Sequence, residues 1–299
     1  MQWQTSRFLM DLNTPRVMGI VNVTPDSFSD GGQHVSGHAA MRHCEQLVKE
    51  GADILDIGGE STRPGAVAVP VEEELARVLP VVRHAVTLGV PVSVDTYKPA
   101  VMQAVLDLGA DIINDIWALR WRDQPEGLSG TAVVAAHASC GVCLMHMHRD
   151  PQTMQVSPMA GEVMPQVLSF LEQHVQFLRG LGVDMARICL DPGVGFGKTV
   201  AQNFALLAQQ ADLAALGYPL LAGWSRKSSL AAVMQTALGD VACMDVQDRV
   251  VPSITAAVLA VQNGAHVVRV HDVKETVQAL KVLAAMQAHT RSNNNDNQR

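Results

Sequence analysis

The segment Ile188-Cys-Leu-Asp-Pro-Gly-Val-Gly-Phe-Gly-Lys-Thr199 sets the pattern of this chain. It opens as a short apolar strand, of the kind that is buried on both faces of a parallel sheet. The strand ends on the carboxylate of Asp191, and a loop with three glycines follows. Only three residues separate Gly193 from Gly197, whereas a P-loop needs four at this point, so the segment does not predict nucleotide binding. A strand of a barrel followed by its loop is the better interpretation.

The same order of strand, polar residue and loop recurs along the chain. We expect seven further strands at residues 17–23, 53–59, 90–94, 112–113, 142–145, 219–223 and 266–270. Helical stretches with apolar residues at three- and four-residue spacing lie between them, such as Ala39–Glu50, Val71–Thr87, Pro99–Leu108, Val163–Leu181 and Lys274–His289. Eight strand–helix units in about 250 residues are typical of a TIM barrel. The predicted fold class is therefore α/β, a (β/α)8 barrel with its active site at the carboxyl ends of the strands.

The eight units use nearly all of the 299 residues, which indicates one domain. We expect an N-terminal lead-in over residues 1–16, the barrel over 17–290 and a disordered tail over 291–299, where the sequence is rich in asparagine.

Composition and charge exclude several classes of function. A formal net charge of −7 without any basic run argues against a nucleic-acid partner. Residues 1–16 lack the apolar core of a signal peptide, and the longest apolar region, 132–147, is too short to cross a bilayer. We therefore expect a cytoplasmic protein without membrane contact.

Cysteines and histidines raise two alternatives. Cys140-Gly-Val-Cys143 leads into a strand and not into a helix N-terminus, so a structural role is favoured over a redox pair. His146 and His148 end a strand two residues apart and could share a metal, as in some barrel hydrolases. His271-Asp272 could add a ligand, but the remaining strands end without a further histidine. A metal-dependent hydrolase thus stays as an alternative.

The polar residues at the other strand ends indicate a different chemistry. Asp95, Asn114, Asp191 and Lys227 follow four strands and suit a flat heterocycle, because a carboxylate accepts two parallel N–H bonds. Arginine, histidine and asparagine side chains suit a diphosphate with a hydrated magnesium ion: Asn22, Arg63, Arg269 and His271. No serine, cysteine or lysine has an evident partner base, so covalent catalysis is not predicted.

The sequence resembles dihydropteroate synthase from about Val17 to the last helix. The motifs that carry the resemblance are Met18-Gly-Ile-Val-Asn-Val-Thr-Pro-Asp-Ser-Phe-Ser-Asp-Gly-Gly32, Gly58-Gly-Glu-Ser-Thr-Arg-Pro-Gly65, Ser93-Val-Asp-Thr96, Asn114-Asp-Ile116, Leu144-Met-His-Met147, Asp191-Pro-Gly193 with Phe196-Gly-Lys198, Ser225-Arg-Lys-Ser228 and Arg269-Val-His-Asp272. The resemblance implies a transferase of folate biosynthesis that condenses 6-hydroxymethyl-7,8-dihydropterin diphosphate with p-aminobenzoate, giving 7,8-dihydropteroate and diphosphate.

The resemblance also implies roles for individual residues. The pterin would be held by Asp95, Asn114, Asp191 and Lys227, with Met145 and Phe196 against its ring. The diphosphate and Mg²⁺ would be held by Asn22, Arg269 and His271, helped by Thr62. The p-aminobenzoate side, where sulfonamides compete, would be lined by Phe28, Arg63, Pro64 and Ser228. A homodimer through the late helices is implied as well.

Some residues depart from the family pattern. Tyr97 and Trp117 stand where smaller or more polar residues are expected, and the segment Leu119–Gly130 is longer. These positions affect the rim of the site and not the reaction. A pterin-dependent methyltransferase on the same barrel is a further alternative, although it would not need Asn22 or Arg63. A non-catalytic pterin-binding protein is another, but it should have lost Arg269 and His271.

Overall fold

The computed structural model describes residues 1–24, 33–62, 65–122, 124, 126–238 and 245–296. Phe28, Arg63 and Pro64, which the resemblance places beside p-aminobenzoate, lie outside the described residues. The same holds for most of the segment Thr24–Gly32.

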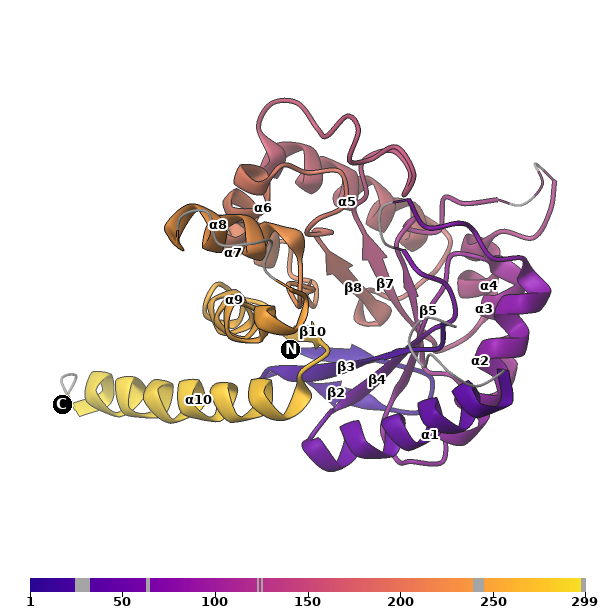
Figure 1. The fold of residues 1–299 in the computed structure, drawn as a ribbon, viewed down its shortest axis with the longest axis horizontal. Helices are drawn as coiled ribbons and strands as arrows, with labels where there is room; N and C mark the ends of the chain where they lie inside the picture. The colour runs from indigo at the N-terminus through magenta and orange to yellow at the C-terminus, as the bar shows by residue number, and fades with distance from the viewer. Residues whose placement is uncertain (25–32, 63–64, 123, 125, 239–244, 297–299) are drawn as a thin grey trace.

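Eight parallel strands form the centre of the molecule (Figure 1). They are β3 (Arg16–Asn22), β4 (Ile54–Gly58), β5 (Val92–Asp95), β6 (Ile112–Asp115), β7 (Gly141–Met145), β8 (Ile188–Asp191), β9 (Leu221–Ala222) and β10 (Val267–Val270). Their order is β8-β7-β6-β5-β4-β3-β10-β9. A parallel bridge between Leu190 and Leu220 joins β8 to the β9 segment and closes the ring. The predicted TIM barrel is confirmed, and each of the eight expected strand segments contains or overlaps an observed strand.

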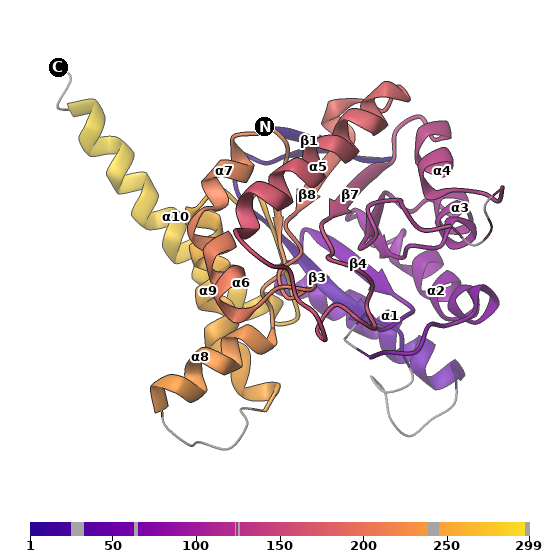
Figure 2. The same ribbon diagram turned by 90° about the horizontal axis from the view of Figure 1, so that it is seen from above.

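Helices surround the strands (Figures 1 and 2). They are α1 (Gln33–Glu50), α2 (Val71–Ala85), α3 (Pro99–Asp107), α4 (Gly130–Ala136), α5 (Val163–Gly180), α6 (Val200–Ala208), α7 (Gln210–Ala214), α8 (Ser228–Leu238), α9 (Val250–Gln262) and α10 (Val273–Asp296). Helix α10 runs past residue 291, where we expected a disordered tail to begin, and its end projects from the barrel (Figure 2). No helix of the described chain is long and apolar enough to cross a membrane.

The N-terminal lead-in forms an antiparallel hairpin of β1 (Gln2–Gln4) and β2 (Leu9–Asp11). Trp3 of this hairpin is fully buried and packs with Met18, Ile54 and Ile112, which lie near the amino ends of their strands. Its Nε1 donates to the carbonyl of Arg187 at 3.0 Å. A Cβ at Gly141 would lie 3.2 Å from the Gln4 carbonyl oxygen, so the glycine admits the hairpin. The hairpin thereby closes the end of the barrel opposite the polar strand ends.

The cysteines of the C-x-x-C segment are buried free thiols in the described chain. Arg187 donates to the Cys140 sulfur at 3.2 Å, and Cys143 lies in register with Cys189 of β8. Burial raises the pKa of Cys140, and the hydrogen bond with Cys189 together with burial raises the pKa of Cys143; both shifts oppose the reactive thiolate form. The geometry fits the structural role expected for this pair.

Candidate functional site

Arg269 lies at the centre of the polar groups at the barrel mouth. Its Nε donates to Asp56 Oδ2 at 2.6 Å, and its Nη2 donates to Asp95 Oδ2 at 2.8 Å. Nη1 takes part in no hydrogen bond between described residues. Because a guanidinium has five N–H donors in one plane, the two carboxylates fix its orientation and leave further donors for an anion.

Asp56 connects this arginine to the neighbouring strands, although it was not among the site residues expected from the sequence. Its fully buried carboxylate accepts from Ser93 Oγ at 2.5 Å and from Asn114 Nδ2 at 3.3 Å as well as from Arg269. An acid in the middle of the apolar run Ile54–Ile57 was the signal available in the sequence. A buried carboxylate needs such partners, and here they position Asn114 and Arg269 relative to each other.

Asp191 and Lys227 carry opposite charges at the mouth, and each opposes the pKa shift that burial causes in the other. Asp191 is 6% exposed, and its Oδ1 accepts the Gly193 N–H at 2.7 Å. Burial raises the pKa of Asp191, and the Gly193 N–H and the Lys227 ammonium oppose that shift. Burial likewise lowers the pKa of Lys227 to about 8, with Asp191 opposing. Both groups therefore favour a ligand that satisfies their charges.

Apolar side chains lie beside these charges. Met145 lies in register with Asp191 and packs in one cluster with Phe196, Ile116 and Met147. The Lys227 ammonium lies 4.3 Å from the centroid of the Phe196 ring. One wall of sulfur and aromatic atoms next to carboxylates and an ammonium suits a flat heterocycle with a polar edge.

The glycine loop after β8 wraps around Lys198. Its ammonium donates to three carbonyl oxygens, those of His146 at 3.2 Å, Gly193 at 2.8 Å and Phe196 at 3.2 Å. A Cβ at Gly193 would lie 1.9 Å from the His146 oxygen, so only glycine fits there. Lys198 thus holds the loop in place, unlike the phosphate-binding lysine of a P-loop.

His271 and the segment after β9 are joined at the mouth. The Ser225 hydroxyl lies 2.9 Å from His271 Nδ1 and accepts the His271 backbone N–H at 3.2 Å. Arg226 makes two bonds to Asp272, at 2.6 and 3.2 Å. These contacts join the segment after β9, which carries Lys227, to the segment after β10, which carries His271. Ser228 is the exposed first residue of α8.

His146 and His148 do not form a metal site in this arrangement. The buried His146 ring packs edge-on against Phe170, and burial lowers its pKa to about 2. His148 is half-exposed, and its Nε2 lies 3.3 Å from Arg149 Nε. Across the described chain, no group of three or more histidine, cysteine or acidic residues could hold a metal ion. The hydrolase alternative therefore lacks structural support.

Comparisons with known proteins fit this geometry. The family model described as "Pterin binding enzyme" matches residues 18–271. The dihydropteroate synthase of Neisseria meningitidis serogroup B is 46% identical over 289 residues, which are 95% of this chain and 97% of the relative. The chain belongs to the dihydropteroate synthases among the pterin-binding enzymes.

Two solved dihydropteroate synthases share the fold over almost their whole length. The Burkholderia cenocepacia enzyme, in complex with 7,8-dihydropteroate, is 48% identical with a TM-score of 0.85, and the match covers 97% of this chain and 98% of that one. The Xanthomonas albilineans enzyme with 4-aminobenzoic acid is also 48% identical with a TM-score of 0.83, covering 94% and 96%. A family resemblance inferred from the motifs is thereby confirmed.

The predicted pterin residues of this dihydropteroate synthase family member come from five strand ends and the loops after them. Asp95, Met145 and Asp191 end their strands, and Asn114 is the last residue but one of β6. Phe196 and Lys227 lie in the loops that follow β8 and β9. Asn22 is the last residue of β3, and Thr62 follows β4 at the same end of the barrel. Their individual roles stay predictions, to be tested by substitution.

Proposed function

We propose that this protein condenses 6-hydroxymethyl-7,8-dihydropterin diphosphate with p-aminobenzoate, giving 7,8-dihydropteroate and diphosphate. The observation that carries the proposal is the set of charged groups at the barrel mouth, Asp95, Asp191, Lys227 and Arg269, in a chain of this family. In the reaction the methylene carbon of the pterin loses its C–O bond to diphosphate and forms a C–N bond to the arylamine. The enzyme is a transferase of folate biosynthesis in this proposal.

Recognition of the pterin is assigned to Asp95, Asn114, Asp191 and Lys227. Carboxylates accept N–H bonds from the amino-pyrimidine edge, and the Lys227 ammonium donates to a ring nitrogen or carbonyl. Met145 and Phe196 cover the ring faces. A loose, cation-like transition state needs no strong base, so the side chains have to position the two reactants and exclude water.

Departure of diphosphate is assigned to Arg269 and His271, with help from Thr62. Asp56 and Asp95 orient the Arg269 guanidinium, so its remaining donors are already aligned before the leaving group develops charge. Removing one preorganised donor of this kind costs about 2.7–4 kcal/mol in the oxyanion hole of another enzyme class. The arylamine side is assigned to Phe28, Arg63, Pro64 and Ser228, where sulfonamides would compete with p-aminobenzoate.

A magnesium ion fits the donor set at the end of β3. Asn22 is half-buried and in register with Gly58, and its amide oxygen is a hard neutral donor. Mg²⁺ binds through few protein oxygens together with water and substrate phosphates. We infer that Asn22 would hold it, and the ion would neutralise charge on the diphosphate. EDTA should then abolish turnover and Mg²⁺ should restore it, whereas restoration by zinc alone would contradict this assignment.

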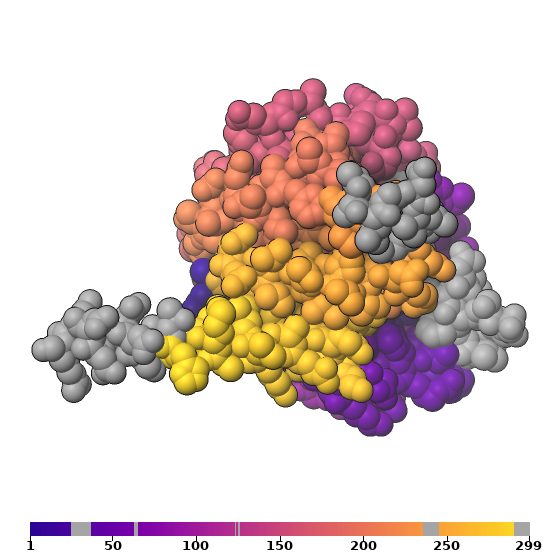
Figure 3. Space-filling view, turned by 60° about the vertical axis from the view of Figure 1, so that its left-hand side comes forward, coloured from indigo at the N-terminus to yellow at the C-terminus, as the bar shows by residue number. Residues whose placement is uncertain are grey.

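The proposal also includes a cytoplasmic homodimer. Helices α9 and α10 pack side by side and form one face (Figure 3). Val251, Leu259 and Val282 on these helices are exposed by 73%, 43% and 72%. Three exposed apolar side chains on two adjacent helices favour burial of this face against a second copy of the chain. Light scattering at micromolar concentration checks the dimer, and a monomer would exclude it.

Release of diphosphate decides the proposal. Purified protein is mixed with the pterin diphosphate, p-aminobenzoate and Mg²⁺, and diphosphate and dihydropteroate are measured together. Equal amounts of the two products are expected. Pterin binding without diphosphate release would instead favour the pterin-dependent methyltransferase or the non-catalytic binding protein.

A further inference from the structure

The segment that carries Lys227 leaves the sheet before it reaches the barrel mouth. Strand β9 has two residues, Leu221 and Ala222, and its pairing with β10 ends at Ala222 opposite Val268. Lys227 and His271 lie further along the chain than these paired residues, so strand pairing does not fix the separation of their side chains. Because the two side chains are assigned to the pterin and to the diphosphate, contacts outside the sheet have to hold them at a distance that one substrate can span.

Two side-chain bridges join the segment after β9 to the segment after β10. The Ser225 hydroxyl bonds both the ring and the backbone N–H of His271. The next residue, Arg226, bonds the next residue of the other segment, Asp272: its Nε donates to Oδ2 at 3.2 Å and its Nη2 to Oδ1 at 2.6 Å. The two side chains are only 22% and 15% exposed. A bidentate pair of arginine and carboxylate fixes the orientation of both groups as well as their distance.

The backbone of Arg226 is held in a conformation that a free chain would avoid. Its φ value is 60°, in the left-handed region that is costly for a residue with a side chain. Its N–H donates to Ser253 Oγ at 2.9 Å, and its carbonyl accepts from Arg249 Nη1 at 3.1 Å. Ser253 Oγ also donates to the Arg249 carbonyl. Residues at the start of α9 thereby impose this conformation, and strain of this kind is concentrated at functional segments.

Neighbouring side chains of this segment reach different parts of the barrel. Arg226 reaches Asp272, directly before α10, whereas the Lys227 ammonium lies 4.3 Å from the centroid of the Phe196 ring in the loop after β8. A Cβ at Gly195 of that loop would lie 3.2 Å from Lys227 Cδ. The bond to Asp272 therefore fixes the point from which the Lys227 side chain extends toward the mouth.

We propose that Arg226 and Asp272 are positioning residues of the reaction, which set the separation between the Lys227 ammonium and His271. The inference rests on the proposed function, because it needs one substrate that touches both of these side chains. The bridge aligns the two contacts before the substrate binds, so the pterin diphosphate gains both without rearrangement of the protein. A ligand that touches only one of the two side chains gains nothing from the bridge.

Binding of three ligands separates positioning from a general structural role. They are 6-hydroxymethyl-7,8-dihydropterin, inorganic diphosphate with Mg²⁺, and the pterin diphosphate with Mg²⁺, each measured by calorimetry with the full-length protein. Arg226→Met and Asp272→Asn should each weaken binding of the pterin diphosphate at least about tenfold, because the preorganisation is lost. Both variants should bind the pterin and inorganic diphosphate within about threefold of wild type, since each of these touches one side only. Equal weakening of all three ligands, or unchanged binding of all three, would overturn the proposal.

Further variants show whether the bridge is the cause. The double variant Arg226→Met with Asp272→Asn should bind the pterin diphosphate like each single variant, because all three lack the same bridge. Additive losses would contradict this. Arg16→Met is the matched control: it removes a bond of 3.0 Å to Asp53 at the start of β3, in a pair whose side chains are 28% and 30% exposed. It should bind all three ligands like wild type.

Two measurements keep the outcomes separate. Urea unfolding checks that each variant is folded, and Arg226→Lys, which retains the charge but not the two parallel bonds, replaces Arg226→Met if the latter is not; its loss should be smaller and again confined to the pterin diphosphate. Wild-type protein that binds no pterin diphosphate would end the proposed function and the bridge together. Wild-type protein that binds it and turns it over, with folded variants that match it, would overturn the bridge alone.

Discussion

At the scale of single residues, opposite charges from different strands meet or influence each other at the barrel mouth. Arg269 of β10 bonds Asp56 of β4 and Asp95 of β5, and Asp191 of β8 faces Lys227 after β9. Burial raises the pKa of Asp95, and Arg269 opposes the shift. Perturbed groups of this kind concentrate where ligands bind.

Asp191→Asn tests recognition of the pterin. The amide can retain the Gly193 bond but presents a donor to the donor groups of the pterin. Loss of a charge-assisted hydrogen bond costs about 1.5–3 kcal/mol, and an unpaired buried group adds about 1–3 kcal/mol, so kcat/KM should fall at least about a hundredfold. His271→Ala should instead lower kcat more than pterin affinity. Calorimetry measures the pterin affinity of the two variants, and turnover at saturating pterin diphosphate measures kcat. If Asp191→Asn bound the pterin like wild type, the pocket would lie elsewhere.

The pH dependence of kcat/KM should report Lys227. Its pKa is lowered to about 8 by burial, so the side chain is charged below pH 8 and loses its proton above it. If the ammonium donates to the pterin, kcat/KM for the pterin diphosphate falls as pH rises through about 8, by about tenfold per unit. Lys227→Arg keeps the charge and should remove this fall, even if its activity is lower. If kcat/KM of the Lys227→Arg variant fell in the same way at alkaline pH, another group would be responsible for the titration.

At the scale of elements, the segment from β4 to α2 is fixed at both ends by one carboxylate. Glu60, just after β4, accepts the N–H of Val69 near the start of α2 and also bonds Tyr97 and Lys98 after β5. Lys98 in turn bonds Glu74 Oε2 of α2 at 2.5 Å. The segment that carries Thr62 is thus attached to two neighbouring units of the barrel.

Lys98→Met should therefore destabilise the fold. Its side chain is 4% exposed, and its removal leaves the buried carboxylates of Glu60 and Glu74 without a cation. Breaking a buried ion pair on one side costs about 3–5 kcal/mol, which urea unfolding measures. Adding Glu74→Gln to Lys98→Met should recover part of the loss, since one uncompensated charge disappears. If the double variant were no more stable than the single one, this charge cluster would not be the cause.

At the scale of the whole molecule, one end of the barrel carries the candidate site and the other end is closed by packed side chains. The polar strand ends lie at the carboxyl end, and the N-terminal hairpin closes the other end with Trp3. Stability and activity should therefore be separable by position, as is general for this fold.

Trp3→Ala tests this separation. Removing a fully buried tryptophan side chain costs about 3–5 kcal/mol, so the urea midpoint should fall clearly. Because the hairpin lies away from the charged mouth, kcat/KM of the folded variant should stay within about twofold of wild type. A loss of activity as large as that of Asp191→Asn, under conditions where the variant is folded, would show that the two ends are coupled.

The sequence alone determined the eight strands and the polar residue at the end of most of them. Apolar runs such as Ile188–Leu190 are too short and too continuous for anything but buried strands, and parallel strands place their carboxyl ends together. Asp95, Asn114 and Asp191 could therefore be predicted to share a mouth without any knowledge of their distances. Local pattern was sufficient because each signal lies within one strand and its loop.

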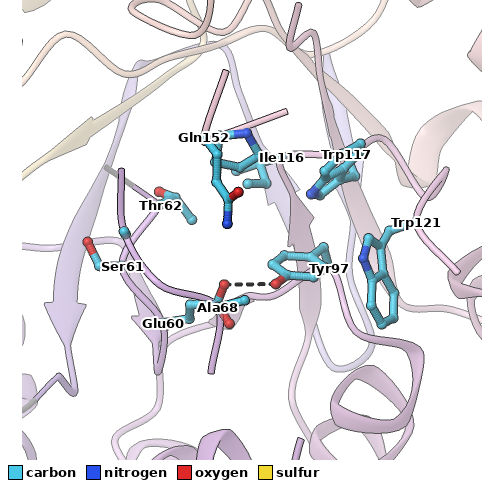
Figure 4. A pocket seen from close by; sticks show the side chains of 11 residues that line it. Glu60, Ser61, Thr62, Ala68, Tyr97, Ile116, Trp117, Trp121 and Gln152 are labelled. Atoms are coloured by element: carbon cyan, nitrogen blue, oxygen red, sulfur yellow. Dashed lines mark hydrogen bonds between the residues drawn. The ribbon is translucent and has the colours of Figure 1, made fainter. Parts of the chain in front are cut away.

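The tertiary structure alone decided which distant residues meet. Asp56 and Arg269 are 213 residues apart and become partners only when the ring closes, and Trp3 meets the Arg187 carbonyl across 184 residues. Tyr97, Trp117 and Trp121, which line one side of a cavity at the rim of the barrel (Figure 4), likewise meet only because of how the loops after β5 and β6 turn. In the second of these loops Ala118 and Leu119 have positive φ values of 51° and 61°. Periodicity assigns a residue to a strand or helix and to one of its faces. The contacts between distant elements form only when the barrel closes, because the local pattern of one element does not indicate which distant element it will contact.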